Sequence, residues 1–202
     1  MKRKSILFML CIMFLILGTA QAQVELGAIV GLNLANVDVK PEESGVDFKI
    51  KKSFAIGGVF DYEINENFSF TATPVYITKG TKVEFPGSGI DFKVSYFEIA
   101  ALLKFKLPTE KTRPYILAGP SLGFLLSAKQ DDEDVKDDFK NMDFSLNIGA
   151  GLSIPVNNNT IFIEFRYAFG LNNISEDPDE DETVKNRGLQ FMAGITFPVG
   201  GN

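Results

Sequence analysis

The sequence has 202 residues, of which 45% are hydrophobic and 23% are charged, a balance that fits one domain with a sizeable core. The formal net charge is −6 and basic residues cluster only near the N-terminus, which argues against a nucleic-acid-binding protein. Histidine is absent, which excludes Ser-His-Asp and Cys-His catalysis within this chain.

The N-terminal segment has the pattern of a secretory signal peptide. Three basic residues at positions 2–4 precede an uninterrupted apolar run at 6–17, and Ala-Gln-Ala at 20–22 is a small-x-small cleavage site. The apolar run is too short for a spanning helix, although an uncleaved membrane anchor is the alternative interpretation. We therefore expect a cleaved signal at residues 1–22 and an exported domain at residues 23–202, which has no cysteine.

The exported part alternates apolar and polar residues with a period of two, which is typical of β-strands. In residues 95–107 one face is wholly apolar and the other includes Glu98 and Lys104, whereas a helix would separate these two charges widely. The same split predicts eight long strands, at about residues 24–34, 53–64, 68–79, 95–107, 114–127, 144–154, 161–171 and 189–199. Pro74 and Pro120 interrupt two of them, and we expect a bulge or local distortion there because proline removes a ladder donor.

The connections between these segments alternate in length. Those at 65–67, 108–113 and 155–159 are short turns, and the others are long and polar, near residues 35–52, 80–92, 128–142 and 172–187. This rhythm, with strands long enough to cross a bilayer, is typical of an outer-membrane barrel with short periplasmic turns and long external loops. The sequence thus predicts an all-β, eight-stranded, antiparallel up-and-down transmembrane barrel with both termini at the short-turn end.

In such a barrel the apolar face meets lipid and the mixed face points inward. Glu98, Lys104, Glu164 and Arg166 are then expected inside, where buried charges persist only when paired. The sequence predicts a structural network of these four charges that fills a lumen too narrow for a general porin. A proton or ion path is the alternative role for them. Alternation does not say which face is inside, so a soluble calycin-like ligand-binding barrel is a further alternative.

Two predicted loops are strongly acidic, within residues 131–138 and 176–182. Carboxylate clusters can bind Ca²⁺, but neither loop has the Asp-x-Asp-x-Asp-Gly spacing of a calcium loop. We interpret both as solvated loops, with divalent-cation binding or bridging to lipid phosphates as the alternative.

Three stretches resemble the PorT-like family of outer-membrane β-barrel proteins. They are G-L-N-L-A-N at residues 31–36, Y-F-E-I leading into L-L-K-F at residues 96–105, and P-Y-I-L-A-G-P at residues 114–120. The resemblance covers about residues 23–197 and implies a barrel in the outer membrane of a Gram-negative-type cell. The family is largely of unassigned function, and its name implies a link with protein secretion. Residues 194–199 also resemble a barrel-assembly signal, although Met192 and the Gly-Gly-Asn terminus depart from it.

Together these features predict a structural or interaction protein of the cell envelope, with an accessory role in secretion as the alternative. No catalytic, cofactor-binding or metal-binding residues are predicted, because an outer-membrane enzyme without histidine would need an unusual base. The expected partners are outer-membrane lipid, the barrel-assembly machinery, and envelope or secretion proteins.

Overall fold

The structure is a computed structural model that describes residues 24–41, 47–85, 88–109, 111–176 and 182–199. The predicted signal peptide and its cleavage site lie outside the described residues. Among the described residues, no helix is long and apolar enough to cross a membrane.

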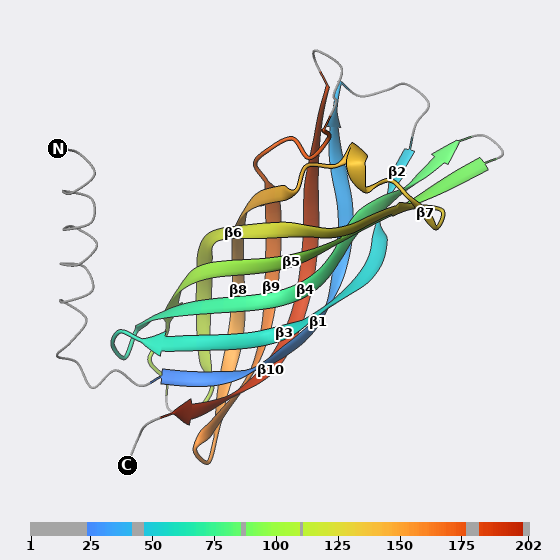
Figure 1. Ribbon diagram of the computed structural model, residues 1–202. Helices are drawn as coiled ribbons and strands as arrows, with labels where there is room; N and C mark the ends of the chain where they lie inside the picture. The colour runs from blue at the N-terminus through green and yellow to red at the C-terminus, as the bar shows by residue number, and fades with distance from the viewer. Residues whose placement is uncertain (1–23, 42–46, 86–87, 110, 177–181, 200–202) are drawn as a thin grey trace, which may run out of the picture.

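The described chain is built almost entirely from β-strands, with one short 3₁₀ helix near its middle (Figure 1). In chain order the elements are β1 (Val24–Lys40), β2 (Asp47–Lys49), β3 (Lys51–Glu63), β4 (Phe68–Phe85), β5 (Ser88–Lys106), β6 (Arg113–Gln130), β7 (Glu133–Asp134), η2 (Lys136–Asp138), β8 (Met142–Val156), β9 (Asn159–Gly170) and β10 (Thr183–Val199).

Eight long strands close into an antiparallel ring. Each long strand pairs with the next long strand along the chain, and β1 pairs with β10 from Val24↔Val199 to Lys40↔Thr183, which closes the sheet. The two-residue and three-residue strands β7 and β2 extend the sheet on β6 and β4. The predicted all-β, eight-stranded, up-and-down antiparallel barrel is therefore confirmed.

The two faces of the sheet differ as the alternation predicts. Large apolar side chains cover the outside of the ring, with exposed fractions of 53% at Val30 and 62% at Ile116. The inside carries many small or polar side chains, such as the fully buried Ser69 and Thr71, together with buried apolar ones such as Ile29 and Leu102. A soluble protein rarely exposes so continuous an apolar surface, whereas lipid solvates it. The apolar rows are outside, so the calycin-like alternative is wrong.

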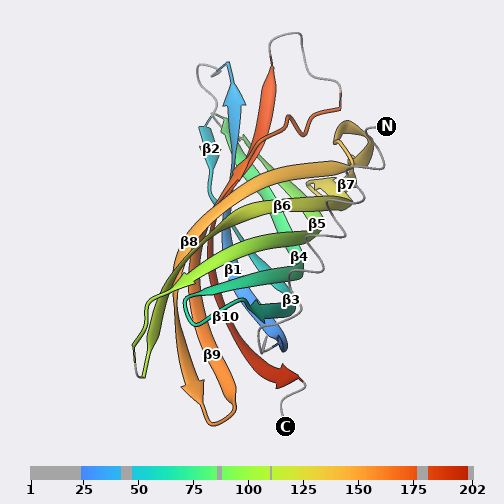
Figure 2. The same ribbon diagram turned by 90° about the vertical axis from the view of Figure 1, so that its left-hand side faces the viewer.

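The short turns gather at one end of the barrel, which we call the inner end, and the long connections at the other, the outer end. In Figures 1 and 2 the β3–β4, β5–β6 and β8–β9 turns lie at the inner end, together with the start of β1 and the end of β10. The described termini therefore lie at the short-turn end, as predicted.

The outer end is more regular than the sequence predicts. Residues 80–92 do not form a long loop, because β4 and β5 stay paired from Phe68↔Phe105 to Phe85↔Ser88. Strand β1 likewise continues to Lys40 and β10 begins at Thr183, within regions predicted to be loops. These hairpins extend beyond the region covered by the apolar outer rows, because polar residues with alternating valine and phenylalanine still form ladders.

The two prolines distort the sheet only locally. Strand β4 runs through Pro74 in constant register, with only the pairs at Gly58 and Val59 of β3 missing there. The shift in register lies elsewhere, between Ser95 and Tyr96 of β5, where β6 has one extra residue. The ladder between β5 and β6 likewise lacks two pairs beside Pro120, at Ala101 and Leu102, so the expected local distortion is present at both prolines, whereas the bulge itself lies six residues after Pro120.

Candidate functional site in the barrel lumen

A cluster of buried charges crosses the lumen near the inner end. Lys104 Nζ of β5 lies 3.0 Å from Glu164 Oε1 of β9 and 3.4 Å from Asp61 Oδ2 of β3. Arg166 of β9 donates its Nε–H to Glu164 Oε2 at 2.7 Å. Two cations thus face two carboxylates in what we call the inner cluster, defined as Asp61, Lys104, Glu164 and Arg166. Because β3, β5 and β9 lie on different sides of the ring, these contacts reach across the lumen.

Neutral hydrogen-bond donors and acceptors complete the inner cluster. Tyr115 of β6 donates its hydroxyl to Glu164 Oε1 at 2.8 Å, and Thr71 of β4 donates to Asp61 Oδ2 at 2.6 Å. Arg166 Nη1 reaches Thr73 Oγ1 at 3.3 Å. Charged groups in a low-dielectric interior are stable only when their hydrogen-bonding capacity is met in this way.

Tyr115 also packs under the Lys104 ammonium, whose Nζ lies 4.9 Å from the centre of the Tyr115 ring. Space for this ring comes from Gly151 of β8, where an added Cβ would lie 2.4 Å from Tyr115 Cζ. The glycines and alanines of the inner face therefore let large polar side chains from neighbouring strands cross the lumen.

A second cluster lies nearer the outer end and centres on Lys79 of β4. Its Nζ lies 2.5 Å from Glu98 Oε2 of β5 and 2.9 Å from Asp143 Oδ2 of β8. Asn186 of β10 donates Nδ2–H to the same Asp143 oxygen at 2.9 Å. The ring of Tyr96 lies beside the ammonium, with its centre 5.3 Å from Nζ. We call Lys79, Glu98 and Asp143 the outer cluster.

The structure places all four charges singled out in the sequence inside the barrel, with exposed fractions of 2% to 5%. It brings Lys104, Glu164 and Arg166 together, whereas Glu98 contacts Lys79 in the outer cluster instead. Sequence reasoning missed Lys79 and Asp143 because both fall where predicted strands meet predicted loops. Asp61 lies on the polar face of a predicted strand, but its spacing does not identify Lys104 as its partner.

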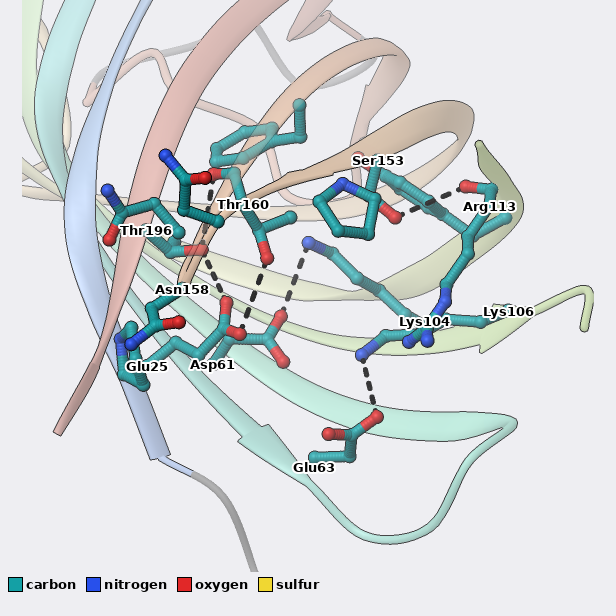
Figure 3. Close-up of a pocket in the computed structure, with 16 residues that line it drawn as sticks. Glu25, Asp61, Glu63, Lys104, Lys106, Arg113, Ser153, Asn158, Thr160 and Thr196 are labelled. Carbon is teal, nitrogen blue, oxygen red and sulfur yellow. Dashed lines mark hydrogen bonds and ion pairs between the residues drawn. The ribbon is translucent and has the colours of Figure 1, made fainter. Parts of the chain in front are cut away.

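A polar pocket of about 370 Å³ opens at the inner end, below the inner cluster (Figure 3). Lys104, Lys106 and Arg113 line one side and Glu25, Asp61 and Glu63 line the other. Lys106 Nζ lies 3.5 Å from Glu63 Oε1 across this mouth. Thr160 and Thr196 donate to the Glu25 carboxylate at 3.4 and 2.5 Å. The charges of this pocket are thus divided by sign across the bore.

The acidic loops form no metal site in the part of the chain that the structure describes. In the first loop, Asp131 accepts a hydrogen bond from the Asp91 backbone at 3.0 Å, and Asp134 accepts one from the Lys136 backbone at 3.0 Å. Asp131 therefore connects this loop to β5, and Asp134 stabilises a local turn. Four acidic residues of the second loop, at 177 and 179–181, lie outside the described residues, so the alternative of cation binding stays untested for this loop.

Removing the Tyr115 hydroxyl tests how strongly the inner cluster depends on its neutral donors. Tyr115→Phe is expected to lower the free energy of unfolding by about 1.5–3 kcal/mol, because a buried hydrogen bond to a charged group is lost. Urea unfolding in detergent micelles measures it. Tyr76→Phe is the matched control, because Tyr76 donates to the neutral Ser95 hydroxyl at 2.9 Å and a loss of about 0.5–1.5 kcal/mol is expected. Equal losses would contradict a special role for the Glu164 contact.

Comparisons with known proteins agree with this architecture. The family described as "Outer membrane protein beta-barrel domain" matches residues 19–176. The crystal structure of Neisserial surface protein A has a TM-score of 0.61 at 18% identity, covering 89% of this chain and 100% of that one. The outer membrane protein OprG from Pseudomonas aeruginosa has a TM-score of 0.58 at 11% identity, covering 90% of this chain and 97% of that one. At these identities the likeness concerns the fold alone. Among curated proteins, none matches the sequence.

Proposed function

Because the chain belongs to the outer membrane protein beta-barrel domain family, we propose that it is a structural or interaction protein of the cell envelope rather than an enzyme or a general porin. Its lumen is filled by side chains, and its hairpins extend the barrel at the outer end. The outer membrane of a Gram-negative-type cell, reached through a cleaved signal peptide, is the compartment that this proposal requires.

The observation that supports the proposal most directly is the inner cluster. Lys104 Nζ on β5 lies 3.0 Å from Glu164 Oε1 on β9, and Arg166 and Asp61 lie beside this pair within the lumen. An eight-stranded barrel has an interior just wide enough for side chains, so a cross-lumen ion pair leaves no continuous wide path for solutes. The charges are satisfied by one another, which supports a structural role for Glu98, Lys104, Glu164 and Arg166 over an ion path.

Conductance in planar bilayers tests the closed lumen. The unmodified protein is expected to give no porin-like conductance steps. The double variant Glu164→Ala/Arg166→Ala removes one charge of each sign and should open a narrow water path with small, measurable steps. The matched control is Glu63→Ala/Lys106→Ala, which removes an opposite-charge pair at the mouth and should remain silent. Large steps from the unmodified protein would contradict the proposal.

A role as an accessory component of secretion is a second candidate. The resemblance to the PorT-like family supports it, and so does the charged pocket at the inner end, which faces the periplasmic side in the proposed orientation. The two candidates place the partner at opposite ends. An interaction barrel is expected to use the outer hairpins, whereas a secretion accessory acting from the periplasm would use the short turns.

Photocrosslinking in intact cells separates the two candidates. A crosslinking amino acid replaces Lys93 or Lys129, both exposed near the outer end, or Glu66 or Lys111, both exposed on inner-end turns. Specific adducts from the outer positions alone would support the interaction barrel. Adducts from the inner-end positions to periplasmic or secretion proteins would favour the accessory role. The barrel-assembly machinery is an expected transient partner of newly made chains, because Phe197 and Val199 expose an apolar final strand.

A further inference from the structure

Two charged side chains at the inner mouth have no partner of opposite sign. Of the cations that line the inner-end pocket, Lys104 and Lys106 lie within ion-pair distance of carboxylates. The Arg113 guanidinium forms no ion pair with a described residue. Nor does the Glu25 carboxylate, whose hydrogen bonds come from threonine hydroxyls. Among the described residues, this pocket therefore holds one unpaired charge of each sign.

These two charges lie on opposite sides of the ring. Strand β1 carries Glu25, and strand β6 begins at Arg113. Between them stand β3, β4 and β5 on one side of the ring and β10, β9 and β8 on the other. Figure 3 shows Glu25 on the left of the pocket and Arg113 on the right. A ligand that satisfies both must carry a cation at one end and an anion at the other.

Neighbouring side chains reinforce the sign of each wall. Glu25 lies directly opposite Asp61 in the ladder between β1 and β3, and like charges in that position repel each other. On the other wall, Arg113 precedes by two residues the position of Tyr115, which pairs with Lys106 of β5. Two cations thus lie near each other on adjacent strands. A cation beside Glu25 and an anion beside Arg113 would offset both repulsions.

Free amide groups lie between the two walls. The β8–β9 turn contains three consecutive asparagines, at 157–159, and all three line the pocket. Their side chains form no hydrogen bond with the described residues, so their donors and acceptors are available to the amide groups of a ligand. The turn lies between β6 and β1 along the ring. The pocket volume of about 370 Å³ is near the lower end of the range for small-molecule sites, which suits a small ligand.

We propose that the inner-end pocket binds a short peptide of two or three residues with free termini. Its ammonium group lies against Glu25, its carboxylate lies against Arg113 and Lys106, and its amide groups contact the asparagine turn. A ligand with a single charge leaves one of the two pocket charges unpaired, so both termini are required. The proposal goes beyond both candidate functions, because neither of them assigns a ligand to this pocket.

Isothermal titration calorimetry with the barrel in non-ionic detergent micelles tests the proposal, since a zwitterionic detergent would compete for the pocket. The probes are trialanine, N-acetyl-trialanine, which has no ammonium group, and trialanine amide, which has no carboxylate. Trialanine is expected to bind saturably. Each blocked peptide should bind roughly five- to tenfold more weakly, because one charge-assisted contact is lost. Glycerophosphoethanolamine, the soluble headgroup of an aminophospholipid, carries its two charges closer together and should bind no better than the blocked peptides.

Two variants assign each terminus of the peptide to its side chain. Glu25→Gln should weaken trialanine to the level of N-acetyl-trialanine and leave N-acetyl-trialanine unchanged. Arg113→Gln should weaken trialanine to the level of trialanine amide and leave trialanine amide unchanged. Lys111→Gln, on the exposed β5–β6 turn outside the pocket lining, is the matched control and should bind like the unmodified protein.

A heat-dependent gel shift checks that each variant is folded. Equal affinity of the unmodified protein for all three peptides would overturn the proposal, and so would tighter binding of glycerophosphoethanolamine than of trialanine. The same conclusion would follow if the folded Glu25→Gln variant weakened trialanine and N-acetyl-trialanine equally, because Glu25 would then not contact the ammonium group.

Discussion

Replacing Glu164 with glutamine is expected to destabilise the barrel by about 3–5 kcal/mol, the largest effect of any single substitution considered for this lumen. Glu164 accepts from Lys104, Arg166 and Tyr115, and its side chain is wholly buried. Without its charge, the two cations of the inner cluster have only Asp61 opposite them. The free energy of unfolding in urea, with the protein in detergent micelles or lipid vesicles, measures the loss.

Two controls define what this result means. Glu63→Gln removes the Lys106 partner at the inner mouth, where both side chains are partly exposed and lie 3.5 Å apart, and should cost no more than about 1 kcal/mol. In the double variant Glu164→Gln/Arg166→Met, a cation leaves with the anion, so the loss should be smaller than the sum of the two single losses. If Glu164→Gln costs as little as Glu63→Gln, water screens the inner cluster and the lumen is not filled as described.

The sequence predicts which residues share a face of the sheet, because successive side chains of a strand point to opposite faces. Glu98 and Lys104 share a face for that reason, and both are inside. The alternation along a strand does not say which of the two faces is inside. That prediction came from the alternating short and long connections, which are typical of a membrane barrel. The two-residue period and the alternating lengths of the connections were together enough to predict an eight-stranded membrane barrel.

The partners of the buried charges could not be predicted in the same way. Glu98 and Lys104 are six residues apart on one strand, so their Cα atoms are about 20 Å apart and cannot belong to one contact. Each pairs instead with residues of other strands, Glu98 with Lys79 and Lys104 with Asp61 and Glu164. These contacts depend on the stagger between neighbouring strands and on the tilt of the strands in the barrel, which no single segment of sequence specifies.

The outer hairpins were missed for a different physical reason. Residues 80–92 combine charges with a Pro-Gly-Ser-Gly turn, which favours a loop by composition. Their valines and phenylalanines nevertheless alternate, and the ladder between β4 and β5 continues to Phe85↔Ser88. A polar hairpin outside the lipid does not need an apolar outer face, so the pattern that identifies a membrane strand fades while the hydrogen bonding continues.

Phe165→Arg is expected to destabilise the barrel by about 2–4 kcal/mol, because the arginine would face lipid near the middle of the wall. Phe165 is 44% exposed on the outside, next in sequence to the buried Glu164, and its ring packs edge-on against Phe191 with centres 5.1 Å apart. Urea unfolding in lipid vesicles measures the change, and refolding yield into vesicles should fall with it.

Phe165→Leu is the matched control, since it keeps an apolar side chain against lipid and should cost less than about 1.5 kcal/mol. The contrast between neighbouring positions makes the test specific to the orientation of the sheet. At Glu164 the loss of a charge destabilises, whereas at Phe165 the gain of one does. If the outer wall faced water, Phe165→Arg would be nearly neutral and would improve solubility without detergent. That outcome would contradict the lipid-facing wall, whereas a large loss in vesicles together with a small loss for Phe165→Leu follows only if lipid covers this row.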